Sequence, residues 1–433
     1  MQFFRISKGY RTCSMPDHAH PLLGRYNEES LTVSTDAHLA PRPSPRFAHL
    51  GIETAPGQEA RHSTPAPHGV DFSHGDVNAF PPPDATIDEV ERAYADGGRS
   101  AYSTYRGHSD IRASLAPLLA EFTESPVNPD NELILTPGTQ AGLFLALSSL
   151  VEVGDKVAVV EPDYFANRKI VKYLGGQMVP VGLHYASAGT AAQLDLRQLE
   201  RAFIDGARIV VFSNPNNPTG ILYTHDQINA IASLVDKYNA FAVVDELYSR
   251  LIYPPHTVTH LRGTGIPTER VITLLGPSKT ESLSGFRLGA AIGSPPVIER
   301  MEKLLAIVSL RASGYNQSAL NVWFREPTGW LDRRIDEHRR IRDDLVRTFD
   351  PSSGFEIRAT EGGSYIFPRL PRLRISPERF RHELKATHGI TVTPGTEFGP
   401  TFVDSIRLNF SQHHAPAIDA ARAIVKLAQE YRT

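Results

Sequence analysis

The sequence predicts an α/β fold with a large domain, whose mostly parallel β-sheet lies between helices, and a smaller α+β domain. Up to about residue 290, short apolar runs of strand length alternate with helical patterns, which is typical of a parallel sheet covered on both faces. After about residue 300 the pattern changes to long helices, short strands and a closing helix. The 433 residues also exceed the usual length of one domain.

The elements follow in chain order. A helix over 86–98 is expected to stop at Gly97 and Gly98, and a second helix covers 110–124. Apolar runs bounded by turn residues predict strands at 132–136, 156–162, 178–183, 208–215, 241–246 and 271–276, with helices between most of them, such as 140–151 and 225–239. The later pattern predicts helices at 296–312 and 331–349, strands at 363–370, 389–395 and 405–411, and a helix at 415–431.

Residues 1–68 differ from the rest because they are rich in Pro, His, Ala, Ser and Thr and show no sustained period. Such a composition favours a disordered or loosely draped extension, with an arm that wraps a partner subunit as the alternative. We assign 69–100 to the N-terminal segment of the small domain, 101–305 to the large domain and 306–433 to the C-terminal small domain.

The composition limits the possible functions. A net charge of −3 gives no electrostatic footprint for nucleic acid or an anionic membrane. Cys13 is the single cysteine, which excludes an intramolecular disulfide and a cysteine-based zinc site, and the histidine spacing suits no metal. The chain has neither a membrane-length apolar run nor a signal-peptide core. We therefore expect a cytoplasmic enzyme without a metal.

Ligands of open α/β sheets bind beyond the carboxyl ends of the strands, so the residues that follow each apolar run are the candidates. After 132–136 comes the stretch PGTQAG, where a turn opens a helix. Backbone N–H groups at the helix start, together with the Thr139 hydroxyl, suit a phosphate. Many such turns contain glycine only for steric reasons, so this signal is weak alone.

Two further strand ends carry candidate ligand contacts. Tyr164 follows the run at 156–162, where its ring could cover a flat heterocycle, although a packing role is the commoner one. The stretch NPNNPTG follows the run at 208–215, and its prolines and glycine fix a turn that holds the Asn217 amide near the cleft. A turn-capping role is the alternative for Asn217.

Asp245 ends the apolar run at 241–245, and an acid there is costly unless a cation such as a protonated ring nitrogen pairs with it. Tyr248 lies three residues on and could return to the same cleft. After 271–275 comes GPSKTESLSGFRLG, with Lys279 among small residues and Arg287 eight positions later. An amine near an anion site and another cation can form a Schiff base with an aldehyde, and Arg287 offers a planar fork for phosphate. A solvated surface lysine is the alternative.

This ordered set of motifs, with a late SIRLNF, resembles the fold type I pyridoxal-phosphate enzymes. The most similar group is the class I/II aminotransferases, which includes aspartate aminotransferase, and the resemblance covers roughly residues 70 to 430. It implies that Lys279 holds the cofactor as a Schiff base and moves the proton at the substrate α-carbon. It also implies that Asp245 pairs with the pyridine nitrogen and that Arg407 binds the substrate α-carboxylate.

The resemblance assigns the other cofactor contacts and a partner. Asn217 and Tyr248 would bond to the phenolic oxygen of the ring, and Asn217 would also face the substrate. Tyr102 would reach the phosphate of the neighbouring subunit, which implies a homodimer with shared active sites. Tyr164 would stack on the ring, and the phosphate end would be held by Gly138, Thr139, Gln140, Ser278 and Arg287.

The sequence departs from the family pattern in two places. Gly276 stands where the family usually has serine, so Ser278 is expected to compensate, and Glu281 stands where an aromatic or small residue is common. The segment 74–78 replaces the usual Gly-x-Pro-Asp, and we hypothesise that His74, Asp76 or Asn78 contacts the substrate or acts as an extra acid–base group. A loop histidine with a purely structural role is the alternative. Gly75 is assigned to the same substrate segment.

Transamination between an amino acid and a 2-oxo acid is the first functional prediction. Elimination, replacement or cyclisation at the β- or γ-carbon is the alternative, as in the related 1-aminocyclopropane-carboxylate synthase or natural-product cyclases. A DNA-binding regulator built on this fold is a third possibility, but residues 1–69 are neither basic nor helical in pattern. Arg311 could face an acidic substrate, and a structural role is at least as common for such an arginine. None of these patterns identifies the substrate side chain.

Overall fold

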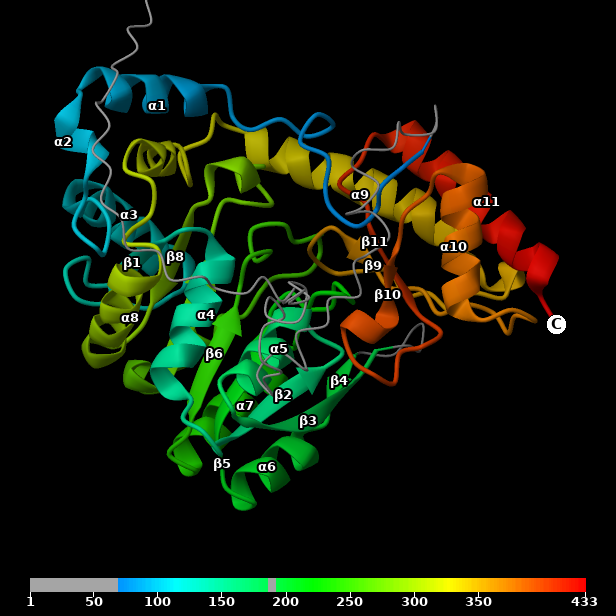
Figure 1. Ribbon diagram of the computed structural model, residues 1–433, viewed down its shortest axis with the longest axis horizontal. Coiled ribbons are helices and arrows are strands. Elements are labelled where there is room, and N and C mark those ends of the chain that lie inside the picture. Colours follow the sequence, from blue (N-terminus) through cyan, green and yellow to red (C-terminus); the bar gives the residue numbers. More distant parts are fainter. Residues whose placement is uncertain (1–68, 186–191) are drawn as a thin grey trace, which may run out of the picture. The chain divides into compact units, whose positions relative to one another are not determined.

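The strands of the computed structural model form one eight-stranded and one three-stranded sheet, and the structure describes residues 69–185 and 192–433 (Figure 1). The predicted extension at 1–68 lies outside the described residues. The larger sheet has the order β1-β8-β7-β6-β5-β2-β3-β4. Its strands are β1 (Leu133–Thr136), β2 (Lys156–Glu161), β3 (Gln177–His184), β4 (Gln193–Leu194), β5 (Ala207–Ser213), β6 (Phe241–Asp245), β7 (Val271–Leu275) and β8 (Gly289–Ile292).

The central strands β3, β2, β5, β6 and β7 run parallel to one another, which confirms the predicted sheet. Strand β8 is antiparallel to both β7 and β1 and was not predicted. Its sequence GAAI consists mostly of small residues, which carry a weak strand signal. The structure explains Gly289, because a Cβ atom there would lie 2.6 Å from the backbone nitrogen of Thr139.

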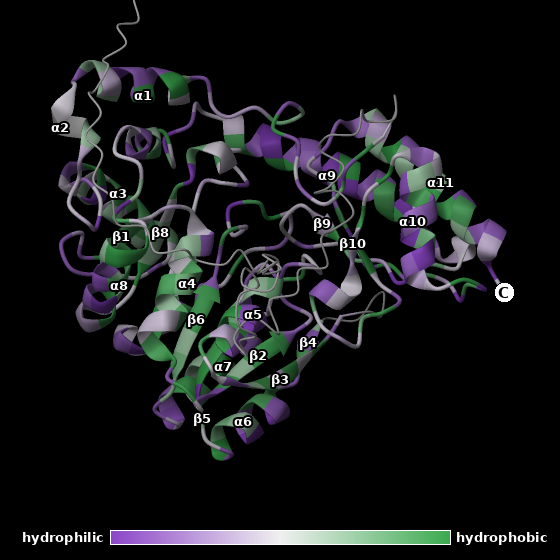
Figure 2. Cartoon of the chain, in the orientation of Figure 1, coloured by the Kyte–Doolittle hydropathy of each residue, from purple (hydrophilic) through white to green (hydrophobic). Residues whose placement is uncertain are grey.

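Helices cover both faces of this sheet. On one face α4 (Thr139–Leu150), α5 (Phe165–Tyr173) and α8 (Pro295–Val308) share a core with Val157 and Val159 of β2. On the other face α6 (Leu196–Ile204) and α7 (His225–Lys237) share a core with Ala158 and Val160 of the same strand. Because successive strand residues point to opposite faces, the middle of β2 from Val157 to Val160 must be apolar, and Figure 2 shows the central strands as hydrophobic.

A separate core surrounds the three-stranded sheet, whose order is β10-β11-β9. Val70, Phe72 and Phe80 from the start of the described chain pack into this core. Its other elements are α9 (Trp330–Thr348), β9 (Tyr365–Ile366), α10 (Pro377–His388), β10 (Thr393–Pro394), β11 (Ile406–Asn409) and α11 (His414–Tyr431). The division of the chain at about residues 100 and 305 stays a prediction.

The remaining helices are α1 (Ala85–Ala95), α2 (Gly98–Ala101) and α3 (Ser109–Phe122), and several predicted bounds were wrong. Gly97 ends α1 with a left-handed φ of 69°, but Gly98 then opens α2. Helix α8 stops at Val308 rather than at residue 312, since Leu310 has a φ of 66° that a helix does not allow. The predicted late strands are only two to four residues long, and α10 was not predicted.

Candidate active site

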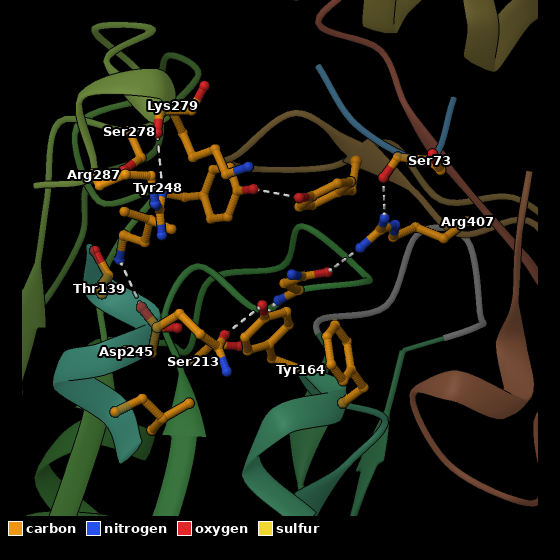
Figure 3. Close-up of a pocket in the computed structure, with 17 residues that line it drawn as sticks. Ser73, Thr139, Tyr164, Ser213, Asp245, Tyr248, Ser278, Lys279, Arg287 and Arg407 are labelled. Carbon is orange, nitrogen blue, oxygen red and sulfur yellow. Dashed lines mark hydrogen bonds between the residues drawn. The ribbon is translucent and has the colours of Figure 1, made fainter. Parts of the chain in front are cut away.

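The predicted candidates converge on one cavity of about 230 Å³ at the carboxyl ends of the central strands (Figure 3). Each strand end contributes because parallel strands finish at the same edge of the sheet. The structure brings together Thr139, Gln140, Tyr164, Asn217, Asp245, Tyr248, Ser278, Lys279, Arg287 and Arg407. Ser73, Ser213 and Tyr365 also line this cavity and were missed by the sequence analysis.

One end of the cavity is built for an anion. Thr139 is the first residue of the 12-residue helix α4, and the guanidinium of Arg287 lies beside the preceding glycine. A Cβ atom on Gly138 would lie 2.4 Å from Arg287 Nη2, and one on Gly276 would lie 2.5 Å from Thr139 Oγ1. A side chain at Gly276 would require the Thr139 hydroxyl to move, which gives this departure a steric reason, and a φ of 83° favours glycine at Gly138. A helix N-terminus facing an arginine suits a phosphate.

A buried carboxylate stands at the end of β6. Burial raises the pKa of Asp245 to about 6, and the nearby Lys279 amine opposes this rise. The Oδ1 atom accepts a hydrogen bond of 3.1 Å from the backbone N–H of Leu247. Since one backbone bond compensates little of the cost of burying a charge, this carboxylate suits a cationic group brought by a ligand.

A hydrogen-bond chain that the sequence analysis missed orients two of the predicted residues. Asp163, two residues after β2, accepts bonds from the backbone N–H of Ser213 (2.9 Å) and of Tyr164 (2.6 Å), and from the Ser213 hydroxyl. The hydroxyl oxygen of Ser213 accepts in turn from the backbone N–H of Asn217 (3.0 Å). Burial raises the pKa of Asp163 to about 8. The strand-end position of Asp163 in EPDYF was the available signal.

Arg407 on β11 presents a buried guanidinium to the cavity, and Figure 3 shows its bond to Ser73. It donates to the Ser73 carbonyl (2.7 Å), to Thr393 Oγ1 (3.2 Å) and to Asn217 Oδ1 (3.2 Å). The ring of Tyr365 lies 4.3 Å from the guanidinium carbon. All three oxygens are neutral, so the positive charge of Arg407 is available to an anionic ligand.

Tyr365 joins Tyr248 at the side of the cavity near Lys279. The two hydroxyl groups are hydrogen-bonded, and the rings meet edge to face with centroids 5.1 Å apart. Burial raises the pKa of Tyr248. For Tyr365, burial acts in the same direction, but the positive charges of Arg407 and Lys279 outweigh it and lower its pKa. The Tyr365 hydroxyl is therefore influenced by the positive charges of both Arg407 and Lys279.

Several predicted substrate or cofactor contacts do not line this cavity. His74 and Gly75 line a second cavity of about 180 Å³ that adjoins the first one at Lys279. Tyr102 is 72% exposed and lines neither cavity, and the Arg311 guanidinium lies over its ring at 4.8 Å. Asp76 also lines the second cavity, where its carboxylate accepts a bond from the backbone N–H of Asn78 (2.8 Å).

The unusual Glu281 lines neither cavity. It is buried, and its carboxylate is paired with Arg250, which also binds Glu326 at 2.7 Å. Burial raises the pKa of Glu281 to about 7. This ion-pair network gives the departure a structural role beneath the lysine segment. Among the described residues, no group of three or more metal-ligating side chains is found, and no helix is long and apolar enough to cross a membrane.

A buried ion pair next to Asp245 predicts a pH-dependent stability. His260 Nδ1 lies 2.5 Å from Glu246 Oε2. Burial alone would lower the pKa of His260, but the Glu246 carboxylate outweighs burial and leaves the pKa raised. A group with a raised folded-state pKa contributes stability fully below its unfolded value of about 6.5 and loses that contribution as the pH rises through the folded value.

We therefore expect Glu246→Gln to lower the free energy of unfolding most below about pH 6.5, and by less as the pH rises. If the pKa of His260 is higher by one in the folded state than in the unfolded state, the free energy of unfolding gains about 1.4 kcal/mol. Urea unfolding of both proteins across the pH range measures this difference. A pH-independent difference would show that the histidine is not charged in the folded state.

Comparison with known proteins identifies the family of this chain. The profile described as aminotransferase class I and II matches residues 67–424. The chain belongs to this family. A crystal structure of an aspartate aminotransferase from Rhodobacter sphaeroides is 51% identical, with a TM-score of 0.85 over 90% of this chain and 99% of that one. The aspartate aminotransferase of Sulfolobus acidocaldarius is 29% identical over 79% of this chain and 85% of its own length. The arginine–pyruvate transaminase of Pseudomonas aeruginosa is 24% identical over 77% and 84%.

The protein is thus a pyridoxal-phosphate-dependent aminotransferase of fold type I, which confirms the predicted family, cofactor and reaction type. The relatives do not favour the alternative of β- or γ-carbon chemistry. The cavity fits this cofactor. It offers an anion cradle for the phosphate, the Tyr164 ring at a strand end, a buried carboxylate for a ring nitrogen and one amine.

Proposed function

We propose that Lys279 holds pyridoxal phosphate as a Schiff base and that the same amine then moves the proton at the substrate α-carbon. The observation that carries this proposal is the position of Lys279, which lines the cavity together with the buried Asp245 and the cradle around Arg287. When bound, the cofactor supplies a ring that accepts the electron pair left at the α-carbon. The lysine is the amine that this cavity offers for both roles.

The other residues hold and orient the reacting groups. Asp245 keeps the ring nitrogen protonated, Tyr164 stacks on the ring, and Asn217 and Tyr248 donate to the phenolic oxygen. Arg407 binds the substrate α-carboxylate with its fork, in a position fixed by Asn217 and Ser73. The phosphate is held by Gly138, Thr139, Gln140, Ser278 and Arg287. The Tyr164 hydroxyl donates to Gln140 (2.7 Å), so Gln140 contributes by orienting the stacking ring.

We also propose a homodimer in which Tyr102 reaches the active site of the partner. Support comes from the exposed apolar residues around it, since Tyr105 is 39% and Leu310 is 42% exposed beside Arg311. Contiguous exposed apolar side chains commonly mark an interface. Arg311 would reach the partner's active site together with Tyr102. The single Cys13 supports a reducing compartment, and we propose a cytoplasmic location and a role in amino acid metabolism.

Two half-reactions test the proposed function. The cofactor-loaded enzyme, mixed with an amino acid in the absence of any acceptor, is expected to release one 2-oxo acid per active site and then stop. Adding a 2-oxo acid is expected to restore the original absorption spectrum and form the corresponding amino acid. Continuous formation of ammonia or of an unsaturated product from the amino acid alone would contradict transamination.

A further inference from the structure

The second cavity, which adjoins the first at Lys279, is lined mainly by uncharged polar groups. If the substrate amine reacts where Lys279 stands, as the proposed function requires, a substrate side chain can extend into this space. The chain supplies an unusual number of hydroxyl groups here. The lining serines are Ser278, Ser282, Ser284, Ser364 and Ser411.

The hydrogen of the Ser411 hydroxyl is directed by His338. The Nδ1 atom of this histidine lies 2.8 Å from the backbone carbonyl of Arg334, which can only accept, so Nδ1 carries the hydrogen. His338 is fully buried against the Phe80 ring (3.9 Å between centroids) and stays neutral, because burial lowers its pKa to about 3. Its Nε2 atom is therefore an acceptor, and it receives the Ser411 hydroxyl hydrogen at 3.1 Å. The oxygen of Ser411 is left to accept a bond from the cavity.

Ser282 offers the cavity a hydrogen-bond donor. Arg334 Nη1 donates to the Ser282 hydroxyl oxygen at 2.9 Å, so one of the two acceptor sites of this oxygen is already occupied. The hydroxyl hydrogen is then available to donate into the cavity. The cavity thus offers an acceptor at Ser411 and a donor at Ser282, each set by a buried neighbour.

The charges around the cavity disfavour an anionic side chain. Of its lining residues, Lys279 is committed to the reaction and Asp76 contributes a carboxylate, while the ring of His74 lies 3.4 Å from the Asp71 carboxylate. Arg334 lies behind Ser282, where its guanidinium is also bonded to the backbone carbonyls of Phe80 (3.4 Å) and Pro81 (2.5 Å). One oxygen of a carboxylate could accept from Ser282, but the other would meet the acceptor oxygen of Ser411 and the charge of Asp76 without a donor.

We propose that this cavity is the substrate side-chain subsite and that it takes an uncharged carboxamide, whose NH₂ donates to Ser411 and whose carbonyl accepts from Ser282. This inference rests on the proposed function, since the amide reaches the cavity only if the α-amine lies at Lys279. A site built to donate and accept in this way rejects an analogue that lacks the matching donor. An acidic substrate bound by Arg311 of a partner copy is the competing outcome.

Calorimetry of the cofactor-loaded enzyme with unreactive substrate analogues tests the subsite. Succinamate and succinate differ only in the carboxamide, as do glutaramate and glutarate. The native enzyme is expected to bind the better-fitting amide at least about tenfold more tightly than the diacid of the same length. One well-formed hydrogen bond and one avoided repulsion account for a difference of about this size. Equal binding, or tighter binding of the diacids, would overturn the proposal.

Two variants identify the residues responsible. Ser411→Ala is expected to bring the amide-to-diacid ratio close to one, whereas Ser233→Ala, on the exposed face of α7, should leave the ratio unchanged. His338→Phe keeps a ring against Phe80 but releases the Ser411 hydrogen, so the ratio should shift towards the diacid. If the Ser411→Ala enzyme kept the native amide-to-diacid ratio, the proposal would be contradicted, even if His338→Phe failed to fold. Intact half-reactions would show that only the subsite assignment had failed.

Discussion

Replacing Lys279 with alanine is expected to lower kcat by about 10⁴-fold or more, because the variant lacks both the covalent attachment and the general base. The carboxylate and phosphate contacts do not depend on this amine, so the variant should still bind cofactor, although more weakly. Steady-state rates of 2-oxo acid formation measure the loss, and fluorescence titration measures cofactor binding.

Lys303→Ala provides the matched control. Its side chain is 73% exposed on α8, where it pairs with Glu299 at 2.7 Å, far from the chemistry assigned to the cavity. This control should keep the native kcat. General acid–base catalysis contributes about 10²–10⁴-fold to a rate. A Lys279→Ala enzyme that retained more than about a hundredth of the native rate would therefore contradict the assigned base role.

Asp245→Asn is expected to lower kcat by about 10²-fold or more. The asparagine keeps the shape of the side chain but removes the charge that holds the ring nitrogen protonated. Breaking one partner of a buried charge pair costs about 3–5 kcal/mol, which is the upper range of the expected effect on the barrier. Measurement of kcat at saturating cofactor separates this effect from weaker cofactor binding.

Asp236→Asn is the control for this substitution, because Asp236 is 58% exposed on α7 and lies 3.6 Å from Arg270. It should change neither kcat nor cofactor binding. If the Asp245→Asn enzyme matched this control when saturated with cofactor, the charge of Asp245 would have no part in the reaction.

The sequence allowed the centre of the site to be predicted because its residues follow strands of a parallel sheet. Asp245 ends one apolar run and Lys279 follows shortly after another, and the ends of such strands meet at one edge. The anion site could be predicted for the same reason, since α4 begins where β1 ends. A local pattern therefore carried information about a three-dimensional arrangement.

The missed residues depend on pairings that no local pattern encodes. Tyr365 lies in an apolar stretch that predicts a core strand, and its partner Tyr248 is 117 residues away. Ser411 and His338 are 73 residues apart, so the direction of the serine hydrogen is set only when the segment after β11 packs against α9. Strand β8 was missed because Gly289 is required for the close approach of Thr139 rather than for strand formation.

The central claim is that the amine of Lys279 holds the cofactor, and reduction with borohydride tests it most directly. Peptide mapping of the reduced, cofactor-loaded protein should find a pyridoxyl group on the peptide that contains Lys279, with about one group per chain. A protein that carries this group on another lysine, or that carries none after reduction, would contradict the account.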